Sequence, residues 1–122
     1  MTVQKLIALA ALLQGHRLVY ADEKVCQDQI EAILFAKGID YRREYRLGDA
    51  GICDFYFPNS RIVLEAKAFK SWSKLKVYRQ CERYCRRPEV AGLLLATGKA
   101  QGLPTVIAEK PVRVHQLGLG AL

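Results

Sequence analysis

The strongest constraint on the fold of this chain is an unbroken apolar run at residues 90–96, whose sequence is VAGLLLA. A strand with one face in water alternates apolar and polar residues, whereas so uniform a run is typical of a strand covered on both faces. Helices on the two sides of a sheet provide such cover. We therefore predict an α/β protein whose mixed central sheet is flanked by helices.

The rest of the chain alternates between helical and extended patterns. Apolar residues at helical spacing, ended by glycine or proline, predict three helices. Their ranges are 2–13, 22–37 and 73–87. Segments rich in β-branched and aromatic residues, bounded by turn residues, predict the remaining strands. Their ranges are 41–47, 52–57, 62–68, 105–108 and 112–117.

Four cysteines are present, and no two of them form a CxxC pair. We interpret Cys26, Cys53, Cys81 and Cys85 as reduced, buried thiols of a cytoplasmic protein. A zinc or iron–sulfur site is the alternative, but such sites usually have more closely spaced ligands.

Two acidic residues are expected to face each other across the hairpin formed by residues 52–57 and 62–68. If the chain reverses between Asn59 and Ser60, Asp54 lies opposite Glu65. Cβ atoms of directly opposed residues are about 4.5–5.5 Å apart, so the two carboxylates repel each other and require a cation. Lys67 follows Glu65 by two residues and is expected on the same face.

This set of side chains suits phosphodiester hydrolysis. Carboxylate oxygens are ligands for Mg²⁺ or Mn²⁺, and such an ion polarises a phosphate and lowers the pKa of bound water. Lys67 is expected to orient or help deprotonate the attacking water and to stabilise the transition state. The alternative is a structural ion pair on a sheet face.

The pattern of Asp54, ten intervening residues, then Glu65-Ala66-Lys67 resembles the PD-(D/E)XK nuclease superfamily. The resemblance covers roughly residues 22–95. It implies a restriction-endonuclease-like fold with an αβββαβ core, metal ligation by Asp54 and Glu65, and the Ala66 carbonyl as a further metal ligand. Cys53 stands where the motif has proline.

A second motif, Gln80 followed four residues later by Tyr84, is similar to the Q-x3-Y motif of the RecB-like branch. The resemblance implies that Gln80 lies near the active site and that Tyr84 helps to hold DNA. Considered alone, the same residues also fit an ordinary amphipathic helix with a polar Gln and a core Tyr.

The superfamily often places a glutamate on the first core helix, and this chain offers Glu23 and Glu31. Glu23 borders the apolar side of the predicted helix, so we prefer it as a catalytic and metal-binding residue. Gln27 supports this choice, because the E-x3-Q pattern resembles VRR-type nucleases. Glu31 is interpreted as a surface charge.

Basic residues are concentrated directly after the ExK motif. The net charge is +7, and residues 67–87 contain eight basic residues and one acid. Four of the basic residues share one helical face and are expected to bind the DNA backbone without sequence specificity. These four are Lys76, Arg79, Arg83 and Arg86. Arg43 and Glu44 are explained by cross-strand pairing.

Together these features predict a single-domain Mg²⁺- or Mn²⁺-dependent deoxyribonuclease, an endonuclease in our interpretation, with low sequence specificity or selectivity for DNA structure. Residues 1–20 form a helical extension, 22–96 the catalytic core and 97–122 the C-terminal strands. The apolar stretch 6–13 is too short to cross a membrane and is expected in the core. A homodimer is expected if both strands are cut. A non-catalytic nucleic-acid-binding module and an RNA nuclease are the alternatives.

Overall fold

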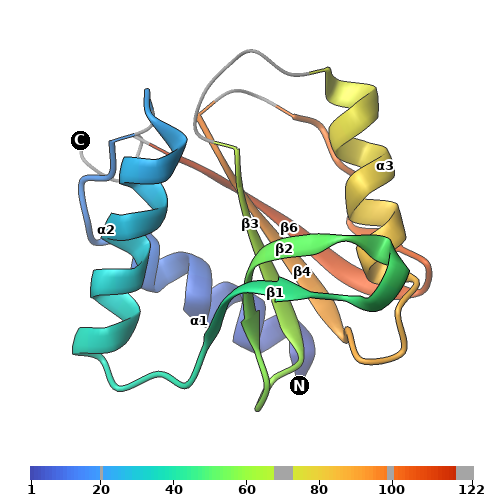
Figure 1. Ribbon diagram of the computed structural model, residues 1–122, viewed down its shortest axis with the longest axis horizontal. Helices are drawn as coiled ribbons and strands as arrows, with labels where there is room; N and C mark the ends of the chain where they lie inside the picture. The colour runs from blue at the N-terminus through green and yellow to red at the C-terminus, as the bar shows by residue number, and fades with distance from the viewer. Residues whose placement is uncertain (20, 68–72, 99–100, 118–122) are drawn as a thin grey trace.

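The computed structural model describes residues 1–19, 21–67, 73–98 and 101–117 (Figure 1). In this part of the chain the helices are α1 (Thr2–Gln14), α2 (Glu23–Ala36) and α3 (Lys74–Cys85), with one 3₁₀ turn, η1 (Gly48–Ala50). The strands are β1 (Arg42–Arg46), β2 (Ile52–Phe57), β3 (Ile62–Lys67), β4 (Gly92–Thr97), β5 (Val106–Ile107) and β6 (Lys110–Gln116).

The strands form one mixed sheet in the order β1-β2-β3-β4-β6-β5. β1, β2 and β3 make an antiparallel meander, β3, β4 and β6 are parallel, and β5 pairs antiparallel with β6. All six residues of β4 are buried, and the strand has a parallel partner on each side. The apolar run at residues 90–96 is therefore a strand covered on both faces, as predicted.

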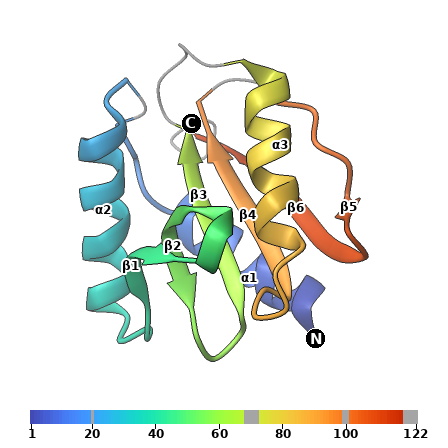
Figure 2. The same cartoon turned by 45° about the vertical axis from the view of Figure 1, so that its right-hand side comes forward.

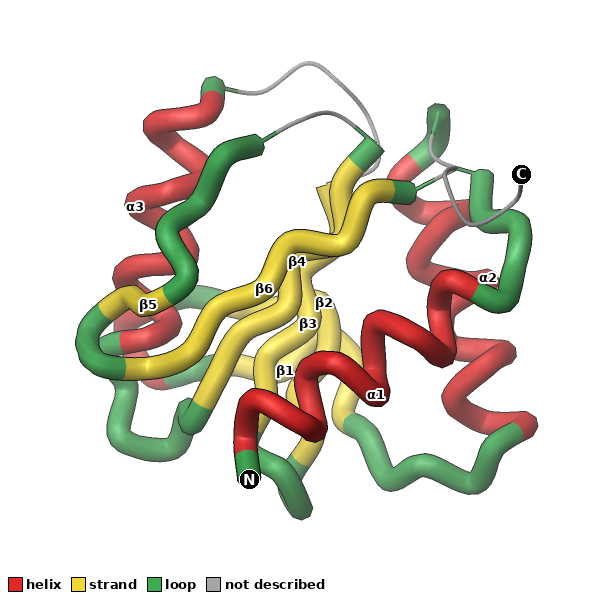
Figure 3. The backbone as a smooth tube through the Cα atoms, turned by 180° about the vertical axis from the view of Figure 1, so that it is seen from behind, coloured by secondary structure: helices red, strands yellow, loops and turns green. Residues whose placement is uncertain are grey.

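Helices cover both faces of the sheet, which confirms the α/β class. α1 and α2 pack on one face, against Phe55, Leu64 and Leu94 among others. α3 packs on the opposite face, against Val63, Leu93 and other residues (Figures 2 and 3). The resulting three layers enclose the central strands β3 and β4 on both sides.

Residues 6–13 lie in α1 and belong to the core, as predicted. Leu6, Leu9 and Leu13 point into the layer between α1 and the sheet. Among the described residues, no helix is long and apolar enough to span a membrane.

The helix ends follow from local hydrogen bonding. The Val25 N–H donates to the side chain of Asp22, which caps α2. Gly38 follows α2 with a φ of +68°, a left-handed conformation that favours glycine. Ser73 caps α3 by accepting from the Lys76 N–H. The predicted helices and strands differ from the observed ones at their boundaries. For example, α3 ends at Cys85 and β4 begins at Gly92. Residue 68, assigned to a strand from the sequence, lies outside the described residues.

At one end of the molecule, the ends of several strands and helices lie together, as is typical of a binding site. Parallel strands end at the same edge of a sheet, so β3 and β4 finish together, and the N-termini of α2 and α3 lie beside them (Figure 2). A side chain at the carboxyl end of β3 therefore lies between two helices on opposite faces of the sheet. This is the common position of ligand sites in open α/β sheets.

The packing predicts how truncations of leucine should act. Leu64 is fully buried in the core, whereas Leu75 is 55 % exposed on α3. Leu64→Ala removes buried apolar contacts and should lower the free energy of unfolding by about 2–5 kcal/mol. Leu75→Ala makes the same chemical deletion at the surface and should change it by less than about 0.5 kcal/mol. Urea denaturation measures both, and equal effects would contradict the packing described here.

Candidate active site

The site is built where the two strands of the β2–β3 hairpin separate. The hairpin has the predicted register, with Phe55 opposite Leu64, and the ladder ends at this pair. Beyond it, the Asp54 N–H donates to Glu65 Oε1 at 3.0 Å and the Ala66 N–H donates to Asp54 Oδ2 at 2.7 Å. Each carboxylate thus takes the place of a backbone acceptor for the opposite strand.

The prediction that Asp54 and Glu65 form a regular cross-strand pair is therefore corrected. The residues are opposed in sequence register, but their side chains lie in the gap between β2 and β3. The neighbouring strand is also irregular at this point, because Glu44 has a φ of +53° and the β1–β2 pairs skip from Arg43–Phe55 to Tyr45–Cys53. The irregular backbone thus extends over β1, β2 and β3 around Asp54.

Glu65 is an almost fully enclosed carboxyl group. Its side chain is 2 % exposed, and Oε2 lies 3.4 Å from Lys67 Nζ. Burial and the neighbouring Asp54 carboxylate raise the pKa of Glu65 to about 8, against the opposing effect of Lys67. Burial also raises the pKa of Asp54, although the Ala66 N–H and Lys67 act in the opposite direction. The two acids thus lack sufficient positive charge in the metal-free protein.

A divalent cation fits this donor set. Two acidic side chains lie together, and among the described residues the second oxygen of Asp54 has no hydrogen-bond partner. The described residues contain no group of three or more His, Cys, Asp or Glu side chains able to hold a metal ion. Mg²⁺ is typically bound by one or two carboxylates, with waters and substrate phosphate oxygens completing its shell. Of such an ion's ligands, these two acids would supply only part.

Of the two candidate glutamates on α2, Glu23 is the one whose pKa responds to the charges of the site. Its side chain is half-buried in the first turn, and burial raises its pKa, with Lys67 and Asp54 as the charges acting on it. Glu31 lies elsewhere. It accepts from Tyr41 Oη at 2.9 Å and pairs with Arg43 at 2.8 Å.

Arg43 was not recognised from the sequence as part of this environment. Its ion pairs are not cross-strand as predicted, because its guanidinium reaches to α2 and pairs with Asp28 and Glu31, each at 2.8 Å. It also lies over the Phe55 ring, 5.8 Å from the centroid, and its charge lowers the pKa of Asp54. Arg43 therefore fixes α2 against the strand that carries Asp54. The only sequence signal for these ion pairs was the spacing of Asp28 and Glu31, three residues apart on α2.

Gln80 and Tyr84 interact, but Tyr84 does not reach the surface. The Gln80 amide donates to Tyr84 Oη at 3.1 Å, and Tyr84 Oη donates to the Ile52 carbonyl at 2.8 Å. Tyr84 is 1 % exposed. The expectation that Tyr84 holds DNA is therefore wrong for this structure, and its observed role is to position Gln80 and to fix α3 to β2.

The basic residues of α3 form a pocket next to the acids. This basic pocket has a volume of about 470 Å³ and is lined by Lys67, Lys76, Val77, Arg79, Gln80 and Arg83. Lys67 is thus shared between the pocket and the Glu65 carboxylate. Arg86 does not line it and instead pairs with Glu82 at 3.1 Å. The predicted basic stripe is therefore divided, with three α3 cations facing the pocket.

The four cysteines are free and buried, as predicted. Burial raises the pKa of Cys26 to about 11 and those of Cys53 and Cys81 to about 12, with Glu65 or Asp54 adding to each shift. Thiols with such pKa values stay protonated at neutral pH. In this protonated form they are poor nucleophiles.

Comparison with known proteins adds no assignment to this geometry. No family model, no curated protein and no solved structure matches the chain. The site is therefore defined by its own residues, which are the partly buried Asp54 of β2 and, at the carboxyl end of β3, Lys67 and the buried Glu65, next to a basic pocket.

The buried acid predicts a pH dependence of stability. The pKa of Glu65 rises from 4.5 to about 8 on folding, so between these values the folded protein holds a proton that the unfolded chain has released. The free energy of unfolding of the metal-free protein should therefore fall as pH rises through this window, by up to about 1.4 kcal/mol per pH unit. Urea denaturation in EDTA, at several pH values, measures the slope.

Two variants test whether Glu65 causes this pH dependence. Glu65→Gln removes the titrating group and should flatten the profile. Asp49→Asn removes an acid whose side chain is 97 % exposed and should leave the slope unchanged. A wild-type slope in Glu65→Gln would show that another group causes the effect.

Proposed function

We propose that this protein is a metal-dependent nuclease that hydrolyses phosphodiester bonds in DNA, with a site of the PD-(D/E)XK type. The observation that carries the proposal is the pair of acids, partly buried Asp54 and buried Glu65, held between separated strands with Lys67 at 3.4 Å from Glu65. A site that gathers uncompensated negative charge next to a basic pocket favours a divalent cation bound together with a phosphate.

The order of the elements supports a restriction-endonuclease-like core within the α/β fold. From α2 onward the chain runs α-β-β-β-α-β, ending at β4, with the helices on opposite faces of the sheet. The candidate acids lie on the second and third strands, and Gln80 lies on the following helix. This arrangement agrees with the resemblance identified in the sequence.

In this proposal Asp54 and Glu65 hold Mg²⁺ or Mn²⁺, with the Ala66 carbonyl as a further ligand and Glu23 approaching from α2. The bound ion supplies Lewis-acid polarisation of the phosphate and lowers the pKa of bound water. The Ala66 N–H fixes one oxygen of Asp54, so that the other oxygen remains available. The Asp54 N–H and Lys67 similarly fix Glu65.

Lys67 has two roles in the proposal. Its ammonium group lies between Glu65 and the basic pocket, where it orients the attacking water and stabilises charge that develops on the phosphate. Gln80, held by Tyr84 Oη, lines the same pocket and can donate to a phosphate oxygen. Lys76, Arg79 and Arg83 then bind the neighbouring backbone, and Arg86 lies farther along.

Substitution of the central residues tests the activity directly. Asp54→Asn and Lys67→Ala should each lower the rate of DNA cleavage by at least about 100-fold, because each removes a group that acts on the reacting phosphate or water. The assay follows plasmid and single-stranded DNA with Mg²⁺, Mn²⁺ or EDTA. Asp49→Asn, at an exposed acid remote from the gap, is the control and should cleave at the wild-type rate.

Three outcomes distinguish the proposal from its rivals. Wild-type activity in either central variant contradicts the assigned roles. DNA binding without cleavage under any metal favours a non-catalytic nucleic-acid-binding module. Preferential cleavage of RNA favours an RNA nuclease.

The two α2 glutamates should respond differently to the same substitution. Glu23→Gln alters the charge beside Asp54 and Lys67 and should reduce the cleavage rate by about tenfold or more, with a larger Mg²⁺ requirement. Glu31→Gln weakens an ion pair with Arg43 and should lower stability by about 1 kcal/mol while cleavage is retained. Cleavage against Mg²⁺ concentration, together with urea denaturation, tests both. The reverse pattern would assign the site to Glu31.

A further inference from the structure

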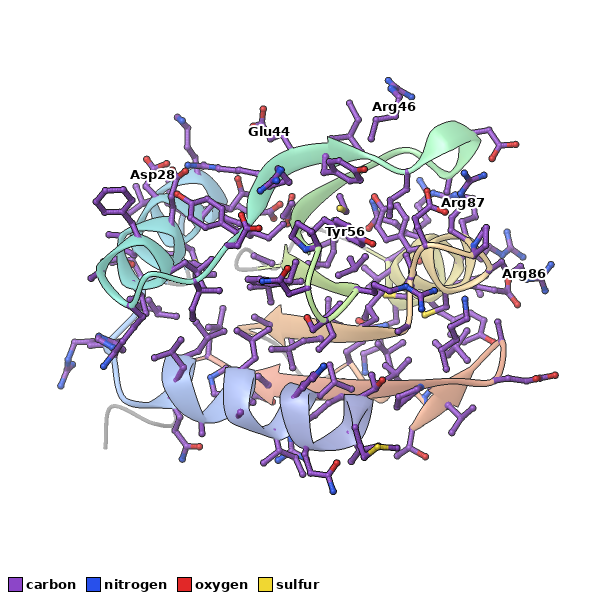
Figure 4. All side chains as sticks on the ribbon, turned by 90° about the horizontal axis from the view of Figure 1, so that it is seen from below. Asp28, Glu44, Arg46, Tyr56, Arg86 and Arg87 are labelled. Atoms are coloured by element: carbon purple, nitrogen blue, oxygen red, sulfur yellow. The ribbon has the colours of Figure 1, made fainter. Side chains whose placement is uncertain are left out.

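The two sides of the candidate site differ in charge. The α3 side carries the cations of the basic pocket, whereas α2 and the adjoining β1 carry acids and cations in equal number. Figure 4 labels examples from both sides, with Asp28, Glu44 and Arg46 over α2 and β1, and Arg86 and Arg87 on the α3 side but outside the basic pocket. The acids of the gap lie between the two sides.

On the α3 side the cations are available to a ligand. Lys76, Arg79 and Arg83 are exposed, and none of them makes an ion pair within the described part of the chain. They converge with Lys67 on one concave surface, which also contains the apolar side chain of Val77. From Lys76 to Arg83 the helix rises by roughly 10 Å, a length comparable with a few successive phosphates of one strand.

On the α2 side most of the cations are already ion-paired, among them Arg42 with Asp40. Lys37 and Arg46 are exposed and make no ion pair within the described residues. Arg43 is held by Asp28 and Glu31, and its side chain is 19 % exposed. Lys24 lies 4.0 Å from Asp28. Glu23 and Glu44 add negative charge close to Asp54. Residues 23–46 carry as many acids as cations, five of each, so a phosphate backbone placed on this side would meet no net positive charge.

A duplex and a single strand make different demands on such a site. A duplex brings two backbones, separated by a groove about 6 or 12 Å wide, whereas a single strand brings one. Non-specific single-strand sites typically combine a positively charged groove with apolar contacts to bases. We propose that the preferred substrate is single-stranded DNA, whose one backbone follows α3 from Lys67 through the basic pocket.

This proposal rests on the nuclease function proposed above and specifies its substrate. It does not require a dimer, because only one strand is cut at a time. The α3 side supplies binding, and the α2 side has no net positive charge with which to hold a second backbone. Single-stranded tails of partly duplex DNA present the same chemistry and should be accepted as well.

A pair of charge reversals on opposite sides of the site tests the proposal. Arg79→Glu and Lys24→Glu change the net charge equally, and both residues are exposed. Arg79→Glu should weaken binding of a fluorescent single strand by about tenfold and reduce the dependence of log K on log salt concentration by about one. Lys24→Glu should change binding by less than about twofold. Fluorescence anisotropy in EDTA measures both, and thermal unfolding verifies the fold.

Substrate preference is tested separately with the wild-type protein. In Mg²⁺, a single strand and a tailed duplex should be cleaved at least about tenfold faster than a blunt duplex of the same sequence, as expected if the duplex's second backbone meets no net positive charge. Equal losses of single-strand binding in Arg79→Glu and Lys24→Glu, or faster cleavage of the blunt duplex, would overturn the single-strand proposal. Absence of cleavage with every DNA and metal would instead contradict the nuclease function, and the two binding variants would still test the charge asymmetry.

Discussion

The separation of β2 from β3 is the constraint on which the rest of the site depends. Two ordinary ladder hydrogen bonds are replaced by the Ala66 N–H to Asp54 and the Asp54 N–H to Glu65. Backbone amides that would otherwise be buried without a partner are thereby satisfied. The same two bonds fix the position of both carboxylates, so the irregularity of the sheet and the geometry of the candidate site have one cause.

This arrangement withdraws acidic side chains from water, which is energetically costly. Charged groups are costly to bury unless they are paired, and the lysine beside Glu65 offsets only part of the charge of the two acids. Arg43 acts on Asp54 from the other side, but it is shared with two acids of α2. At neutral pH the metal-free protein therefore retains a proton on the site, and binding of a divalent cation would be coupled to loss of this proton.

The sequence predicted those parts of the fold that depend on local patterns. The bounds of β2 and the register of its hairpin were correct, because the length of the turn around Asn59 sets which residues pair. The buried strand β4 was recognised from its uninterrupted apolar residues. The end of the ladder at Phe55 and Leu64 was missed, because alternation predicts the face of a side chain but not the point at which two strands separate.

Two other differences arise from contacts between distant segments. Tyr84 follows Cys81 by three residues and Gln80 by four, so helical spacing is consistent with both a core and a surface position. Its burial is decided by the Ile52 carbonyl, 32 residues away. The partners of Arg43 lie 12 and 15 residues earlier on α2 and likewise depend on how the helix packs on the sheet. Local sequence patterns do not contain this information.

The position of the N-terminus has a practical consequence. Thr2 at the start of α1 lies against Gly92 at the start of β4, at the end of the sheet opposite to the carboxyl end of β3 (Figure 2). A purification tag, a fluorophore or a fused DNA-recognition module tethered to Met1 would leave the gap and the basic pocket uncovered. An added module at this pole would therefore leave the candidate site at the other pole accessible.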